Sequence, residues 1–165
     1  MQQAPSVKDR VIFDDHSFEN LTEGQKFSIS ISQDIEVAHF RWLADKSGSL
    51  DLGGNTLYID GDLVVMSDLI NLQNGKFNLT GQNEDPIINI ESSNFETELV
   101  IDVPNDVDIR ISRPFEANSI NLISGRLHIT DISLEVDQFT MSGGELNLTN
   151  STFLLNSRLD IAEEA

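Results

Sequence analysis

Short alternations of apolar and polar residues run through most of the chain. Leu146 and Leu148 are separated by Asn147, and Leu159 and Ile161 are separated by a single acidic residue. Strict alternation places the apolar residues on one face of a strand and the polar residues on the other. No long segment shows the i, i+3, i+4, i+7 spacing of an amphipathic helix. The pattern therefore predicts an all-β protein built from short strands.

The expected strands are three to eight residues long, and turn residues such as glycine, asparagine, aspartate and proline gather between them. They lie at 11–13, 27–31, 35–42, 50–52, 57–59, 63–65, 69–72, 77–79, 88–90, 99–103, 107–111, 120–122, 127–129, 132–136, 139–141, 146–148 and 159–161.

A glycine-led motif recurs at Gly48, Gly75, Gly125 and Gly144. It consists of a small polar corner followed by two apolar residues that are separated by one residue. The gaps of 27, 50 and 19 residues read as one turn, two turns and one short turn of a solenoid. We therefore predict a right-handed parallel β-helix. An antiparallel β-sandwich is the alternative, because Asn74-Gly75 and another Asp-Gly pair suit hairpin turns.

In this solenoid, residues 1–33 are expected to form an N-terminal arm and cap, and residues 34–165 the stacked turns. Outward-facing Asn78, Asn89, Asn121 and Asn147 are expected to form ladders along the stack. A solenoid end is an exposed edge that needs a cap, and nothing after residue 161 is expected to supply one. We therefore expect a fragment of a longer protein, or a chain that stacks on another surface.

Composition narrows the possible partners. The 165 residues carry a net charge of −18, which predicts repulsion of nucleic acid and of anionic membranes. Solubility explains this charge, with affinity for Ca²⁺ or a salty extracellular setting as the sharper alternatives. The absence of cysteine excludes disulfides and thiolate chemistry. No apolar run reaches the ~18 residues that span a bilayer, so no membrane insertion is expected.

Two groups of residues suggest a metal ion. The turn after residue 101 carries several oxygen donors suited to a hard cation, which makes Ca²⁺ the more credible ion: Asp102, Asn105, Asp106 and Asp108. His16 beside Asp14 and Asp15 is a weaker set, because one histidine and two carboxylates in a turn are common.

Two further groups suggest carbohydrate chemistry. Asp106, Asp108, Arg110 and Arg113 resemble the charged cluster of a polysaccharide-cleaving β-helix, and alternation puts Asp108 and Arg110 on one outer face. An exposed ion pair is the favoured interpretation. Three aromatic residues could stack on a sugar, although packing in the core or cap is the favoured role: Phe40, Trp42 and Tyr58.

The first half of the chain resembles a recurring segment that opens a β-solenoid in large secreted surface proteins of Bacteroidota. The matching residues are Val11-Ile-Phe13-Asp14-Asp15-His-Ser17-Phe18, Gly24-Gln25-Lys-Phe27-Ser-Ile29, Trp42 and Leu57-Tyr-Ile59-Asp-Gly61-Asp-Leu63. The likeness covers about residues 5–82. Many proteins of this class are exported by the type IX secretion system, and some are adhesins linked to gliding. This chain differs in having no Asp-Ser or Asp-Thr dipeptide. A signal peptide and a C-terminal sorting domain are also missing from the sequence, and the signal peptide is expected to have been removed.

The resemblance implies a structural segment at the cell surface or outside the cell, and not an enzyme. A stalk or a ligand-presenting rod is the expected function, with neighbouring domains of a larger surface protein or other protein subunits as partners. A carbohydrate-binding or carbohydrate-cleaving β-helix domain is the alternative, with carbohydrate as its partner. We expect no catalytic residues.

Overall fold

The structure, a computed structural model, describes residues 8–22, 24–81, 86–91, 95–111 and 113–162. These residues form two parallel sheets and one short 3-10 helix, η1 (Asp15–Phe18). Sheet A contains β1 (Arg10–Phe13), β4 (His39–Trp42), β7 (Leu63–Val65), β9 (Ile87–Ile90), β11 (Asp108–Ile111), β13 (Arg126–Thr130) and β15 (Glu145–Thr149). Sheet B contains β2 (Phe27–Ser30), β3 (Ile35–Val37), β5 (Gly48–Asp51), β6 (Thr56–Ile59), β8 (Ile70–Leu79), β10 (Phe95–Asp102), β12 (Glu116–Ser124), β14 (Ser133–Met141) and β16 (Thr152–Ile161).

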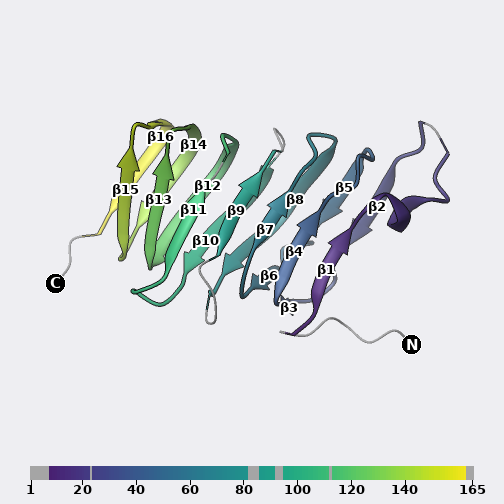
Figure 1. Ribbon diagram of the computed structural model, residues 1–165, viewed down its shortest axis with the longest axis horizontal. Helices are drawn as coiled ribbons and strands as arrows, with labels where there is room; N and C mark the ends of the chain where they lie inside the picture. The colour runs from purple at the N-terminus through teal and green to yellow at the C-terminus, as the bar shows by residue number, and fades with distance from the viewer. Residues whose placement is uncertain (1–7, 23, 82–85, 92–94, 112, 163–165) are drawn as a thin grey trace.

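The chain alternates between the two sheets and coils about six times. In Figure 1 the strands of sheet A run upward in front as the coil advances from right to left, and those of sheet B return behind them, which makes a right-handed coil. Every strand pair in the described chain is parallel. The predicted parallel β-helix is therefore confirmed, and the antiparallel sandwich is wrong. None of the described segments is a helix long and apolar enough to span a membrane.

Sheet B bends over a corner, which gives the coil three faces. The first turns make this bend with two separate strands, since β5 and β6 pair with the first and second halves of β8. In β8 the corner shrinks to Asn74, with a left-handed φ of 58°, and Gly75. A Cβ on Gly75 would lie 2.4 Å from the Cβ of Leu52 in the turn before. Later turns pass the corner within one continuous strand, so each needs fewer residues.

The glycine-led motifs occupy three different kinds of corner, at the start of β5, within β8, and between a sheet B strand and the next sheet A strand. Gly48 is the first residue of β5 and pairs with Ile70, not with the motif at Gly75. Gly125 and Gly144 are equivalent, because the residues that follow them pair across one turn. The interpretation of the 27-residue gap as one turn is therefore wrong, whereas the 19-residue gap is a true turn. All three kinds of corner bring the backbone close to the preceding turn, so all three favour a residue without a side chain.

The interior is a set of aliphatic and aromatic rows that run along the coil. One row on the second half of sheet B contains Ile35, Leu57, Phe77, Leu99, Ile120, Phe139 and Leu159. Its neighbour contains Val37, Ile59, Leu79, Ile101, Leu122, Met141 and Ile161. The central members are fully buried. Alternation in each short strand thus builds the predicted stacking of apolar side chains, and burial of this apolar area stabilises the fold.

The expected ladders of outward-facing asparagines do not form. Asn78 and Asn121 lie two turns apart with Val100 between them. Asn89 lies beside Val64 on sheet A, and Asn147 lies beside a histidine. The register of each turn decides which residues become neighbours, and the spacing of asparagines in the sequence does not show that register.

Within the segment expected to be an arm and cap, β1, η1 and β2 make the first turn of the coil. Asp14 caps η1, and its side chain accepts a hydrogen bond from the Ser17 backbone N–H at 3.1 Å. This hydrogen bond lowers the pKa of Asp14 from its ordinary value. The Phe18 ring stacks on Phe27 and lies 5.4 Å from the Trp42 ring centroid, so η1 covers part of the interior at this end.

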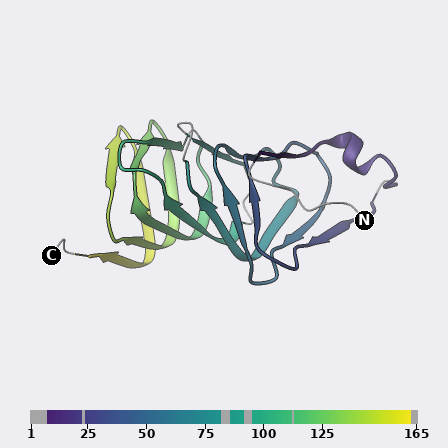
Figure 2. The ribbon, with the colours of Figure 1, turned by 90° about the horizontal axis from the view of Figure 1, so that it is seen from below.

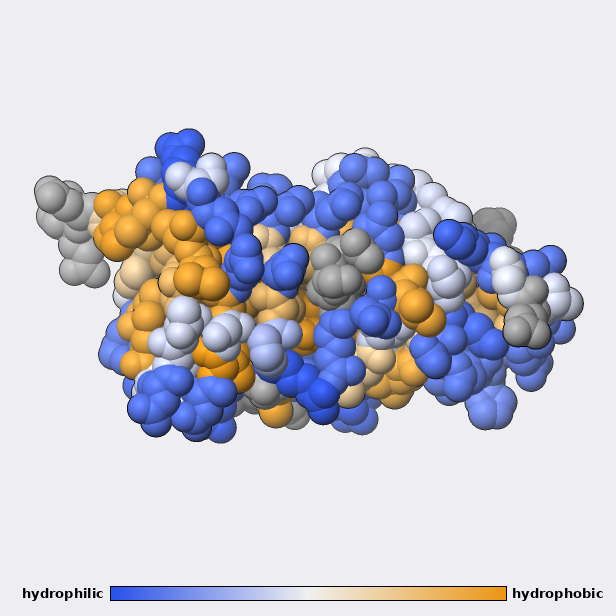
Figure 3. Space-filling model, turned by 90° about the horizontal axis from the view of Figure 1, so that it is seen from above, coloured by the Kyte–Doolittle hydropathy of each residue, from blue (hydrophilic) through white to orange (hydrophobic). Residues whose placement is uncertain are grey.

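The first and last strands lie at opposite ends of an elongated coil (Figures 1 and 2). Much of the surface is hydrophilic, and apolar side chains gather at the C-terminal end (Figure 3). The C-terminal end is therefore more apolar than much of the surface seen in this view.

Candidate functional site

The outer face of sheet A carries the two densest groups of paired polar side chains in the described chain. Phe40 and Trp42 point inward from β4, so the alternating residues His39 and Arg41 point outward. The same alternation turns Asp108, at the start of β11, toward the outer face. This outer face is the candidate site because charged groups from successive turns meet on it.

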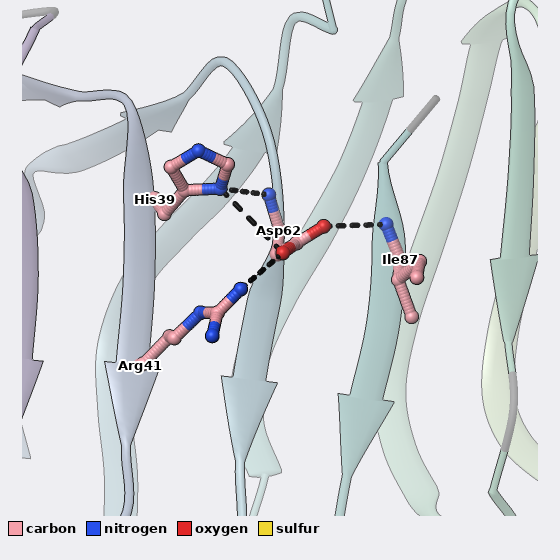
Figure 4. Close-up of polar contacts among 4 residues, drawn as sticks. All are labelled: His39, Arg41, Asp62 and Ile87. Carbon is pink, nitrogen blue, oxygen red and sulfur yellow. Dashed lines mark hydrogen bonds and ion pairs between the residues drawn. The ribbon is translucent and has the colours of Figure 1, made fainter. Parts of the chain in front are cut away.

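The first group centres on Asp62, just before β7 (Figure 4). Arg41 forms an ion pair with it, with 2.7 Å between Nη2 and Oδ2. The backbone N–H of Ile87 donates to Oδ1 at 3.2 Å. One carboxylate thus joins β4 on one side and β9 on the other, across three successive turns.

His39 lies beside this carboxylate and is 8% exposed. The backbone N–H of Asp62 donates to Nδ1 of the ring at 3.0 Å. A nitrogen that accepts a hydrogen bond carries no proton, so this contact requires the neutral ring with its hydrogen on Nε2. Gly61 provides the space, because a Cβ there would lie 2.5 Å from Cε1 of His39. The group therefore acts as a clamp between turns.

Replacing Asp62 with alanine is expected to lower the free energy of unfolding by about 1–3 kcal/mol, because it removes the hydrogen-bond acceptor of the Ile87 N–H and the partner of Arg41. The control is Asp160→Ala, which breaks the exposed Arg158–Asp160 pair and is expected to change stability by less than about 0.5 kcal/mol. Urea unfolding of both variants makes the comparison. Equal losses of unfolding free energy would show that the Arg41–Asp62 contact is an ordinary surface ion pair.

The second group centres on Asp108. Its Oδ1 lies 2.7 Å from Nε of Arg126 and 3.2 Å from Nε2 of His128. Arg126 also donates from Nη2 to the backbone oxygen of Asp106 at 2.6 Å. The hydrogen bond from His128, followed by the charge of Arg126, lowers the pKa of Asp108 from its ordinary value near 3.8.

We expect His128→Ala to raise the pKa of Asp108 toward its ordinary value, because the largest cause of the lowering is lost. A lowered carboxyl pKa stabilises the fold above the unfolded-state pKa, and this stabilisation disappears as the pH falls through the folded-state pKa. Carbon-13 NMR titration of the Asp108 carboxyl measures the change. Thr130→Ala, on the same strand, is the control, and an equal shift in both variants would rule out the His128 contact.

The predicted calcium ligands do not assemble. Asp108 is engaged by Arg126 and His128, and Asp102 accepts a hydrogen bond from the Ser124 hydroxyl at 3.0 Å. Asn105 and Asp106 lie on the exposed turn between them. In the described parts of the chain, no group of three or more histidine and acidic side chains is placed to hold a metal ion.

The weaker set around His16 has other roles. Asp14 caps η1, and Asp15 accepts a hydrogen bond from the backbone N–H of Asp45 at 3.2 Å. These carboxylates stabilise the loop at the first turn.

The predicted polysaccharide-cleaving cluster is dispersed. Asp108 and Arg110 share the outer face of sheet A, as alternation predicts. Arg113, however, forms an ion pair with Glu91. The Asp106 backbone, rather than its carboxylate, makes the contact with Arg126.

For Phe40 and Trp42 the favoured role, packing in the core, is confirmed, and the alternative of a sugar-stacking platform is wrong. Phe40 and Trp42 are buried in the interior rows, and the indole N–H of Trp42 donates to the backbone oxygen of Ala44 at 3.1 Å. Neither ring can stack on a sugar. Tyr58 points outward from β6 on sheet B, on a different face of the coil.

Comparison of the chain with protein-family models, with curated proteins and with solved structures gives no significant match.

The sequence did not predict the clamp of His39, Arg41 and Asp62, because these residues belong to no local sequence motif. They meet because Phe40 pairs with Leu63 one turn later, and this register places Asp62 beside His39. An Asp-Gly-Asp corner about one turn after a histidine is the only signal that could have pointed to it.

Proposed function

We propose that this chain is a structural segment, a stiff rod that spaces or presents other parts of a surface protein. The observation that supports this role is the continuity of the interior rows over successive turns. The rows hold buried apolar side chains from the second turn to the last but one, apart from the partly buried Met141, and main-chain hydrogen bonds join each turn to the next. A coil held together in this way transmits its geometry from end to end.

The paired polar groups support the same proposal. The clamp at Asp62 and the group at Asp108 tie successive turns together, and the donors that could activate a substrate are engaged within the coil. An enzyme would instead need groups converging on a substrate-sized site. We therefore propose a role without catalysis.

A stalk must hold its ends at a fixed separation, and the coil allows this to be measured. One outward-facing column on sheet B begins at Glu36. Thr140 lies in this column five turns from Glu36, and Asp160 lies six turns from it. With ~4.8 Å per turn, the separations should be roughly 24 and 29 Å between backbones. The chain has no cysteine, so pairs of introduced cysteines can carry spin labels.

Pulsed electron spin resonance should give narrow distance distributions that lengthen by one turn spacing from Glu36→Cys/Thr140→Cys to Glu36→Cys/Asp160→Cys. Dilution with unlabelled protein removes the signal from pairs of labels on different molecules. Broad distributions, or equal mean distances in the two variants, would contradict a stiff rod.

We propose a setting outside the cell or at the cell surface, with neighbouring domains or other protein subunits as partners. The high negative charge and the resemblance of residues 5–82 to secreted surface proteins of Bacteroidota support this setting. Protease treatment of intact source cells tests it, with a cytosolic protein as the control. Degradation of the protein while the cytosolic control stays intact is expected, and equal protection of both would contradict the proposal.

A carbohydrate-binding or carbohydrate-cleaving domain is a second candidate. The observation that favours it is the group of Asp108, Arg126 and His128, with Arg110 on the same outer face. A panel of neutral and acidic polysaccharides should show binding or cleavage that is lost in Asp108→Asn. Equal results for the two proteins would remove this candidate.

A further inference from the structure

The C-terminal end of the described coil is an open edge of both sheets. β15 and β16 are the outermost strands of sheets A and B, and each pairs with a neighbour on one side in the part of the chain that the structure describes. The outer edge of such a strand presents backbone N–H and C=O groups that can pair with another strand. This end is therefore a template for a further turn of parallel strands.

The interior rows also stop at this edge. Along one row Ile120 is 0% exposed, Phe139 is 1% exposed and Leu159 is 54% exposed. Ile161 and Leu148 end two other rows at 62% and 47%. Figure 3 shows apolar side chains gathered at this end of the molecule. These side chains are exposed because no turn of the described residues lies beyond them.

The N-terminal end is hollow, whereas the C-terminal end presents exposed apolar side chains. A cavity of about 510 Å³ opens into the interior beside the first strands, and most of its lining is apolar. Its lining includes Val11, Ile29, Ile31, Ile35 and Val37. Phe18 covers the corner next to Trp42, and β1, β2 and β3 have one strand neighbour each in the described chain.

We propose that the C-terminal edge of one copy of this chain docks on the N-terminal end of a second copy, so that the coil continues across the junction. In this register β15 pairs with β1, and β16 pairs with β2 and β3. The exposed side chains then continue the rows that begin at the other end, namely Leu148 onto Val11, Leu155 onto Ile29, Leu159 onto Ile35 and Ile161 onto Val37.

The two surfaces in this contact are different, so the contact is head-to-tail and leaves a free end on each side. Such contacts produce open filaments when successive copies share one axis. The proposal is independent of the stalk role, because a rod with inert ends would still be a spacer. Failure of the association would therefore leave the proposed function untouched.

The outward charges predict how salt affects the docking. The register places Arg158 opposite Asp34 but Asp160 opposite Glu36, and each copy carries a net charge of −18. Repulsion between copies therefore opposes the burial of the apolar ends. Salt shortens the range of this repulsion to about 8 Å at physiological ionic strength. Association should increase from low to physiological salt.

Sedimentation of the whole chain over a concentration series, at low and physiological salt, is the first test. The mean mass should rise with concentration and pass beyond the dimer. Leu159→Lys/Ile161→Lys should block the C-terminal end, and Ile35→Lys the N-terminal end. Each variant alone should be a monomer, and a mixture of the two should form only dimers, because each retains one intact and complementary end.

Association of Ile35→Lys alone into dimers would instead show contact between two C-terminal edges and would overturn the head-to-tail arrangement. A wild-type monomer at every concentration and salt level would overturn self-docking and leave the edge for strands of another protein. The melting temperature of each variant shows whether it is folded.

Cross-linking tests the register without changing the interior. Neighbouring residues on adjacent parallel strands lie close enough for a disulfide, which needs Cα atoms about 4.4–6.8 Å apart. Glu36→Cys mixed with Asp160→Cys should form a mixed disulfide under mild oxidation. Glu36→Cys mixed with Thr152→Cys, from the start of the same β16, should form far less. Equal yields would contradict the register.

Discussion

Replacing Phe77 with alanine is expected to lower the free energy of unfolding by about 3–5 kcal/mol, the cost of deleting a large buried aromatic side chain. Phe77 is completely buried in the second half of β8. Its ring centroid lies 5.7 Å from that of Phe40 and 5.5 Å from that of Phe95. The substitution therefore removes packing against Phe95 in the first half of the next sheet B strand, and across the coil against Phe40 of sheet A. The walls around it are held by hydrogen-bonded strands and relax little.

The measurement is equilibrium unfolding in urea, followed by circular dichroism, together with thermal melting. A loss of this size should lower the melting temperature on the order of 10 °C in a domain of this length. Lys76→Ala is the matched control, because Lys76 precedes Phe77 on the same strand and forms the exposed pair with Glu98. The control should change stability by less than about 1 kcal/mol. Similar losses in both variants would show that the row is not a packed core.

Replacing Gly125 with alanine is expected to lower the free energy of unfolding by about 2–5 kcal/mol. The residue has a left-handed φ of 92°, which costs a residue with a side chain about 1–2 kcal/mol. A Cβ there would also lie 2.2 Å from Cγ2 of Val103 in the preceding turn. Relieving such a contact by shifting the backbone or side chain costs about 1–3 kcal/mol more.

Gly54→Ala separates these two costs. Gly54 has a similar φ of 83°, but a Cβ there would meet nothing within 4 Å. It should show the backbone cost alone, about 1–2 kcal/mol. Urea unfolding of the two variants measures the difference, which is attributable to Val103.

A second comparison tests the steric contact directly. Adding Val103→Ala to Gly125→Ala should cost less than the sum of the two single losses, because the double variant removes the clash. If the two losses add, or if Gly54→Ala is as destabilising as Gly125→Ala, the close approach between turns is not what requires glycine at this corner.

Prediction of the candidate site was weaker than prediction of the fold. Asp108 and Arg110 were correctly assigned to one outer face, because alternation alone decides the face within a strand. The partners of Asp108 were missed, since Arg126 and His128 reach it from the next turn. The aromatic platform, the less favoured alternative, is wrong for a related reason. Phe40 and Trp42 differ from exposed aromatics only in which side of β4 faces the interior.

The amino-acid sequence by itself determined the short strands, their alternation and their parallel stacking into a solenoid. These features depend on the local pattern of apolar, polar and turn-forming residues, which is written along the chain. The tertiary structure decided the register from one turn to the next. That register placed Asp62 between His39 and Ile87, put Val100 between two asparagines, and left Leu159 and Ile161 at an open edge. Corners of unequal length shift this register, so contacts between turns depend on the folded path of every preceding corner.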